Sequence, residues 1–167
     1  LFITLFGIGL LLIAIGSSNP ITDGNIALIK ISGVIVTDDG MSLFGKGTVS
    51  STKIVEKIKE ATEDSAIKAI ILEINSPGGS AVASDEIAQA VKAAQEKNKT
   101  VVAWIREVGA SGGYWIASSA DIIVANRMAI TGSIGVIASY LDYSGLITKY
   151  NVSYQRLVAG KYKDIGS

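Results

Sequence analysis

The sequence predicts an α/β domain with a largely parallel sheet. Short apolar segments typical of strands alternate with longer segments whose apolar residues recur at helical spacing. Glycine-containing turns separate these segments. Strands joined through helices run parallel, and functional sites of such sheets lie beyond the carboxyl ends of the strands. The turns that follow the strands are therefore the first places to look for function.

The first half of the chain contains three predicted strands and two predicted helices. Strands are expected at 26–31 and 34–36, followed by a loop over 37–49. Ser50 or Ser51 is expected to cap a helix with helically spaced apolar residues: Ile54, Val55, Ile58 and Ala61. A buried strand over 67–74 ends in a proline- and glycine-containing turn, 75–79, and a helix is expected over 84–97.

The second half continues the alternation. The predicted elements, in order, are a strand 101–105, a turn 109–113, a helix 114–117, a strand 121–125, a glycine-rich turn 131–136, a helix 146–150 and a strand 152–158. Three segments, 75–79, 109–113 and 125–132, follow strand ends. We expect them to converge on one edge of the sheet.

Composition excludes several classes of function. The chain has 15 basic and 15 acidic residues, and this balance argues against a nucleic-acid partner. It contains no cysteine and no histidine, which removes disulfides, a thiolate nucleophile and the commonest metal ligands. No carboxylate cluster replaces them, so no metal or cofactor is expected.

Residues 1–18 carry no charge and would form a helix of about 27 Å, close to the hydrocarbon thickness of a bilayer. We interpret them as one transmembrane anchor; a cleaved signal peptide and a buried helix are the alternatives. Residues 19–25 are interpreted as a linker and 26–167 as the folded domain. Since the chain starts with Leu1 and stops soon after its last predicted strand, we expect truncation at both ends.

The most informative segment is Gly109-Ala110-Ser111-Gly112-Gly113, between a predicted strand and a helix. A serine there is exposed at a helix N-terminus, as a nucleophile requires. The alternative is a tight turn in which small residues merely permit close packing. A serine nucleophile needs a base, and without histidine the usual triad is excluded within these residues. A neutral lysine is the remaining common base.

Backbone N–H groups for an oxyanion hole are also available. Two glycines, Gly78 and Gly79, allow a substrate carbonyl to approach the backbone without interference from a Cβ atom. The N–H of Gly112, directly after the serine, would be a second donor. The alternative is an ordinary turn after a strand.

The candidate bases are Lys161 and Lys163, which follow a predicted strand rather than lying on a polar helix face. A lysine base requires a pKa lowered by about 3 units through burial away from carboxylates. Alternate residues of an extended segment share a side, so the spacing leaves the choice between the two lysines open.

Four blocks together resemble the signal peptide peptidase A family, Ser-Lys proteases of the Clp protease/crotonase fold group. They are Asn75–Gly79, Gly109–Tyr114, Thr131–Val136 and Gly160–Lys163, and the resemblance covers about residues 24–167. It implies repeated β-β-α units and assigns Ser111 as nucleophile, Lys163 as general base and Ser133 as the residue that orients the lysine. Gly78 and Gly79 correspond to the oxyanion loop and substrate-binding edge.

The same resemblance implies a single-pass protein of the cell membrane with an extracytoplasmic catalytic domain. Its partners would be remnant signal peptides and further copies of itself in a ring, with Ser111 and Lys163 meeting across a protomer boundary. The alternatives are a related membrane Ser-Lys protease that cuts one membrane protein, a crotonase-like acyl-CoA enzyme, and a non-catalytic membrane scaffold.

Overall fold

The computed structural model describes residues 24–38, 47–137, 139–155, 157 and 159. The chain divides into two units, residues 1–135 and 136–167, and each is described by itself. The predicted anchor over 1–18 and most of the predicted linker lie outside the described residues. Among the residues that are described, no helix is both long and apolar enough to cross a membrane.

The first unit is built on a parallel sheet, as predicted. Its strands lie in the order β1-β4-β5-β6, and β7 pairs with the end of β5. A separate parallel pair is formed by β2 and β3. The strand bounds are β1 Ile26–Ser32, β2 Val34–Val36, β3 Thr48–Ser50, β4 Ala69–Ser76, β5 Thr100–Ala110, β6 Ile122–Ala125 and β7 Ile130–Gly132.

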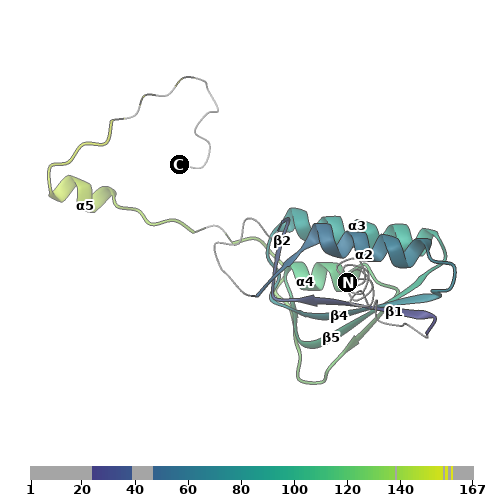
Figure 1. The fold of residues 1–167 in the computed structure, drawn as a ribbon. Coiled ribbons are helices and arrows are strands. Elements are labelled where there is room, and N and C mark those ends of the chain that lie inside the picture. The colour runs from purple at the N-terminus through teal and green to yellow at the C-terminus, as the bar shows by residue number, and fades with distance from the viewer. Residues whose placement is uncertain (1–23, 39–46, 138, 156, 158, 160–167) are drawn as a thin grey trace, which may run out of the picture. The chain divides into compact units, whose positions relative to one another are not determined.

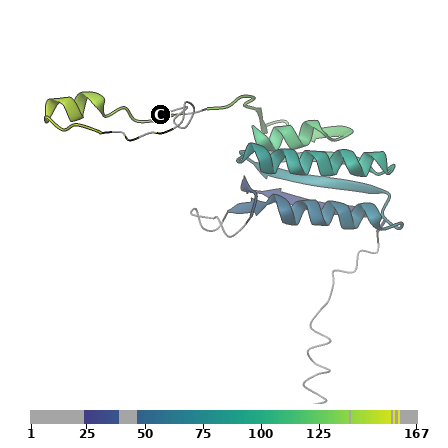
Figure 2. The same ribbon diagram turned by 90° about the horizontal axis from the view of Figure 1, so that it is seen from above.

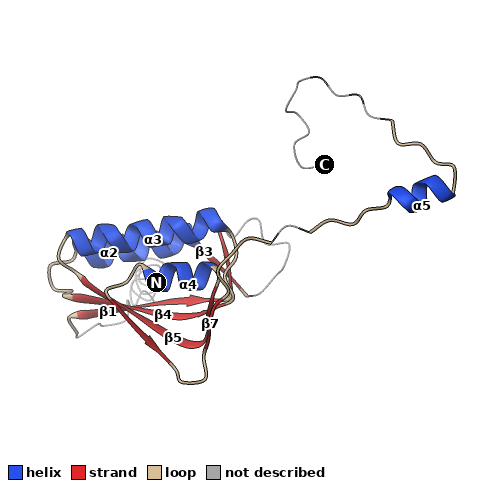
Figure 3. Cartoon of the chain, turned by 180° about the vertical axis from the view of Figure 1, so that it is seen from behind, coloured by secondary structure: helices blue, strands red, loops and turns tan. Residues whose placement is uncertain are grey.

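Three helices of this unit cover one face of the sheet (Figures 1 and 3). They are α2 (Ser51–Glu63), α3 (Ala81–Glu96) and α4 (Gly112–Ser118). Seen from above, they lie side by side in the order α2, α3, α4 (Figure 2). Each strand β4 and β5 leads directly into a helix on this face, so the turns after both strands lie at the same edge of the sheet.

The core lies between the sheet and the helices. Alternate residues of the strands point toward the helices and are buried, in keeping with the two-residue period of a strand. The fully buried large side chains of this layer include Ile31, Ile70, Leu72, Ile74 and Ile105 from the strands and Ile54, Ile58, Ile87, Val91 and Ile116 from the helices. This packing fixes the positions of the strand ends that carry the candidate site.

The opposite face of the sheet has a charged group at its centre. Glu73 in β4 is 8% exposed, and its carboxylate lies 3.0 Å from Nη1 of Arg106 and 3.8 Å from Nζ of Lys30. The two cations come from the neighbouring strands β5 and β1. A buried carboxylate is tolerated when it is paired in this way.

Most predicted elements of this unit are found with shifted ends. The predicted helix 84–97 begins three residues earlier, because Ser80 is its N-cap and its hydroxyl accepts from the N–H of Ala83. Strand β5 runs on to Ala110, beyond the predicted end at 105. Strand β3 (Thr48–Ser50) overlaps the end of the predicted loop 37–49, and its three residues pair with β2.

The second unit contains one described helix, α5 (Ser144–Lys149), close to the predicted helix 146–150. Asp142 Oδ1 accepts a hydrogen bond of 2.8 Å from the Ser144 N–H, and this bond lowers the pKa of the Asp142 carboxyl. The predicted strand 152–158 is wrong over its described residues, 152–155 and 157, which form no strand. Its Val152 and Tyr154 are exposed, and a strand needs a hydrogen-bonded neighbour to be stable.

Candidate active site

The candidate nucleophile lies where two loops meet. Ser111 directly follows β5 and precedes α4, and the turn after β4 packs against it. A Cβ atom placed on Gly78 would lie 2.9 Å from Ser111 Cβ and 2.7 Å from the Gly112 nitrogen. The structure therefore brings Gly78 against Ser111 and Gly112, which lie more than 30 positions later in the sequence. Only a glycine at position 78 allows this approach.

Ser111 has an unusual backbone conformation, with φ 50° and ψ −121°. Residues with a Cβ atom rarely adopt a positive φ, and such backbone conformations are concentrated at functional sites. Two hydrogen bonds hold it: the Ser111 N–H donates to the Gly132 carbonyl at 2.8 Å, and the Trp115 N–H donates to the Ser111 carbonyl at 2.9 Å. Within the described residues, Ser111 Oγ makes no hydrogen bond, and the side chain is partly exposed.

The N–H of Gly112 is available to an incoming oxygen. It belongs to the first residue of α4, where the helix supplies no acceptor. The helix macrodipole adds positive potential at the same point. Gly78 packs closely beside this N–H, since a Cβ atom at position 78 would lie 2.7 Å from the Gly112 nitrogen.

The turn after β4, residues 77–80, is the glycine loop. Besides the N–H of Gly112, the backbone donor available at this loop is the N–H of Gly79, not that of Gly78. The Gly78 N–H donates to Ser76 Oγ at 3.1 Å and is therefore occupied. On the far side of the loop, the Ile35 N–H donates to the Gly78 carbonyl at 2.9 Å, and the Ser80 N–H donates to the Ile35 carbonyl at 2.8 Å. Among the described residues the Gly79 N–H has no acceptor, and Gly79 is exposed. The sequence analysis named both glycines of this loop, and among the described residues the N–H without an acceptor is that of Gly79.

The third predicted turn also reaches this edge. In the β5–β7 pairing Ala110 lies opposite Gly132, whose carbonyl accepts the Ser111 N–H. Ser133 follows Gly132 directly and has a positive φ of 53°. The structure thus places Ser133 one residue from the backbone contact made by the candidate nucleophile, Ser111. Lys161 and Lys163 lie outside the described residues.

Two buried serines of the site were not singled out by sequence reasoning. Ser76 Oγ accepts a hydrogen bond from the N–H two residues later, a contact typical of a serine turn. The following Pro77-Gly78 makes such a turn recognisable in the sequence. Ser84, 1% exposed, packs against Gly112: a Cβ atom there would clash with its Oγ. Nothing in the sequence around Ser84 distinguishes it from an ordinary serine of a helix.

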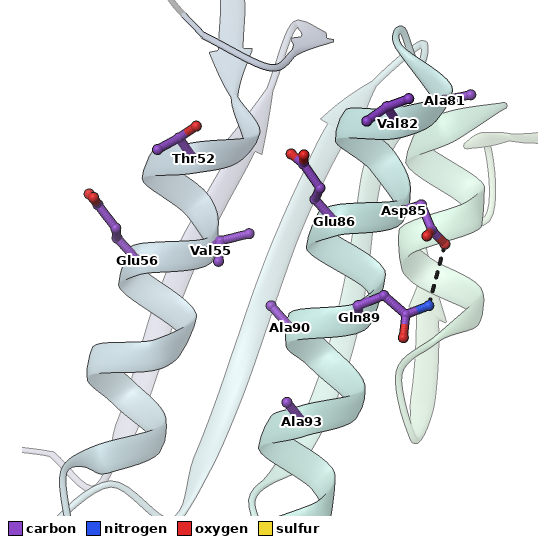
Figure 4. A pocket seen from close by; sticks show the side chains of 10 residues that line it. All are labelled: Thr52, Val55, Glu56, Ala81, Val82, Asp85, Glu86, Gln89, Ala90 and Ala93. Carbon is purple, nitrogen blue, oxygen red and sulfur yellow. Dashed lines mark hydrogen bonds between the residues drawn. The ribbon is translucent and has the colours of Figure 1, made fainter.

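A groove of about 900 Å³ lies elsewhere, between α2 and α3 (Figure 4). Its floor is apolar, and three carboxylates are at its sides; the lining residues are Thr52, Val55, Glu56, Ala81, Val82, Asp85, Glu86, Gln89, Ala90 and Ala93. None of the candidate catalytic residues lines it. Within the part of the chain that the structure describes, no group of three or more potential metal-ligating side chains is present.

Similarity to solved structures supports the predicted fold group. A membrane-bound stomatin-specific protease superimposes with a TM-score of 0.56 at 22% identity, covering 77% of this chain and 59% of that one. A member of the enoyl-CoA hydratase/isomerase family gives 0.51 at 21% identity, covering 81% and 51%. The two neighbours carry out different chemistry, so this likeness establishes the fold alone.

Sequence comparison is more specific. A relative from Enterococcus faecium, named as a signal peptide peptidase SppA, is 35% identical over 91% of this chain and 43% of its own length. The chain spans less than half the length of the curated relatives it matches. The model of Peptidase family S49 matches residues 93–167, which include Ser111, Ser133 and Lys163. Over residues 93–167 the chain is thus similar to Peptidase family S49.

Proposed function

We propose that this chain carries the catalytic centre of a serine endopeptidase that uses Ser111 as nucleophile and Lys163 as general base. One observation carries the proposal: a serine with positive φ stands at a helix N-terminus, directly against a glycine loop. That geometry exposes the hydroxyl and supplies backbone donors beside it. A packing role alone does not require a strained serine at this position.

The proposed reaction begins with attack of Ser111 Oγ on a peptide carbonyl. Neutral Lys163 takes the serine proton and, as an ammonium, gives it to the leaving amine. Ser133 is proposed to hydrogen-bond the lysine and orient it. Water then hydrolyses the acyl-enzyme. The negative charge on the carbonyl oxygen is stabilised by the N–H groups of Gly79 and Gly112.

The proposed substrates are extended apolar peptides, in particular signal peptides left over after their release from preproteins. The name of the Enterococcus faecium relative supports this substrate class. The backbone of the glycine loop supports an extended peptide: Gly79 is bridged to Ile35 on one side, and its own N–H and carbonyl point to the other. A substrate strand pairing with that side would place its carbonyl near Ser111.

We further propose that the protein works at the cell membrane, anchored by residues 1–18, with its catalytic domain on the extracytoplasmic side. The uncharged N-terminal segment supports the anchor. A ring of identical chains is proposed to bring Lys163 of one protomer to Ser111 of its neighbour.

The proposal is tested by the turnover of a fluorogenic apolar peptide by the full-length protein. We expect Ser111→Ala and Lys163→Ala to lower kcat by at least a thousandfold, since each removes a member of the reacting pair. Lys161→Ala is the matched control, two residues from Lys163, and should keep the wild-type rate. Activity that survives in Lys163→Ala would refute the assignment of the base and direct attention to Lys161.

A further inference from the structure

Ser76 occupies a central position beneath the candidate site. It is the last residue of β4 and is fully buried. Its hydroxyl uses both hydrogen-bonding capacities: Oγ donates to the Gly33 carbonyl at 2.6 Å and accepts the Gly78 N–H at 3.1 Å. One side chain thus joins the turn between β1 and β2 to the glycine loop.

The same residue also contacts the helix of the nucleophile. A Cβ atom placed on Gly113, in the first turn of α4, would lie 2.8 Å from the Ser76 carbonyl oxygen and 3.4 Å from its Cβ. Ser76 therefore lies against both segments that supply the proposed oxyanion donors. A change in its side chain is transmitted to both of them through direct contact.

The Ser76 hydroxyl determines which N–H of the loop is free. It holds the Gly78 N–H on the buried side of the loop, while the Gly79 N–H has no acceptor among the described residues. With the acceptor removed, the buried Gly78 N–H would lack a hydrogen-bond partner, which costs free energy. Rotation of the peptide unit before Gly78 toward another acceptor would then be favoured. Such a rotation would change the direction of the Gly79 N–H.

We propose that Ser76 is a positioning residue for the oxyanion hole: its hydroxyl orients the glycine loop so that the Gly79 N–H points at the developing oxyanion. The inference rests on the proposed peptidase function. It predicts a larger effect on the transition state than on the binding of the peptide, because full negative charge develops on the carbonyl oxygen only during the reaction.

The test measures kcat and KM of the full-length protein for the fluorogenic apolar peptide, with Ser76→Ala and Ser76→Cys. We expect Ser76→Ala to lower kcat about tenfold or more, below the 10²–10³-fold cost of losing an oxyanion donor outright, with KM changed less than twofold. Ser76→Cys keeps a weak acceptor of similar size and should recover part of kcat. A peptide aldehyde, whose adduct with Ser111 carries the oxyanion, should lose affinity in parallel with kcat/KM.

Thr62→Val is the matched control. Thr62 in α2 is also buried, and its hydroxyl donates to the Ile58 carbonyl. The substitution removes one buried hydroxyl hydrogen bond at a distance in the fold from the site, so kcat should stay at the wild-type value. If Ser76→Ala keeps the kcat and aldehyde affinity of Thr62→Val, the positioning role is wrong.

Two further outcomes are decisive. If Ser76→Ala does not fold, Ser76→Cys decides alone: reduced kcat with unchanged KM supports the inference, and wild-type kcat overturns it. If the wild-type protein shows no turnover that Ser111→Ala abolishes, the proposed function itself fails, and the inference is overturned with it.

Discussion

At the scale of single residues, the geometry of the candidate site depends on the lack of a side chain at Gly78. A side chain there would occupy the space beside the Gly112 nitrogen and Ser111 Cβ, both within 3 Å of an added Cβ atom. The loop also has φ values of 98° at Gly78 and 155° at Gly79, which favour glycine. The close backbone approach and the positive φ each favour glycine at position 78.

If the proposed function is correct, Gly78→Ala should therefore lower the rate of peptide cleavage strongly. The added methyl group blocks the approach of a carbonyl oxygen to the Gly112 N–H, and we expect kcat to fall by about 10²–10³-fold, as for the loss of one oxyanion donor. The measurement is turnover of the fluorogenic peptide at saturating concentration. Gly24→Ala is the control, since the nearest heavy atom to its added Cβ lies 4.0 Å away. A Gly78→Ala enzyme of normal kcat would contradict the position assigned to the oxyanion.

At the scale of elements, an irregularity in β5 lies just before the candidate nucleophile, Ser111. Its pairing with β4 shifts register between Ile74 and Ser76, where Ile74 faces Ile105 but Ser76 faces Gly109. Asn75 compensates for the irregularity, since its Oδ1 accepts the Val108 N–H at 3.2 Å. Extra residues in one strand of a pair bend that strand locally, so the end of β5 need not continue straight along β4.

Helix α3 follows the glycine loop directly, and its buried face packs in the core. Substitutions on that face should have the larger effect on the free energy of unfolding. Ile87 is fully buried in α3, whereas Val82 on the same helix is 63% exposed. We expect Ile87→Ala to lower the free energy of unfolding by about 2–5 kcal/mol, through lost burial and a cavity. Val82→Ala should change it by less than about 0.5 kcal/mol. Denaturant unfolding measures both, and equal effects would show that α3 is not packed on the sheet as described.

At the scale of the whole molecule, the sequence predicts the α/β class and the converging turns because both depend on local patterns. Apolar periodicity locates β4 and α3, and glycines mark the turns at 78 and 112. The sequence does not reveal which N–H of the glycine loop is occupied, because the bond between the Gly78 N–H and Ser76 depends on tertiary packing. The strand expected at 152–158 was also wrong, since alternation of apolar residues does not reveal whether a pairing strand is present.

The central claim is that Ser111 is the nucleophile of a lysine-activated peptidase, and covalent labelling tests it most directly. The full-length protein is treated with a fluorophosphonate, which forms a stable phosphonyl ester with an activated serine, and the labelled peptide is identified by mass spectrometry. We predict one label, on Ser111, which is lost in Ser111→Ala and strongly slowed in Lys163→Ala. A label on another serine, or equal labelling of Lys163→Ala and wild type, would contradict the account.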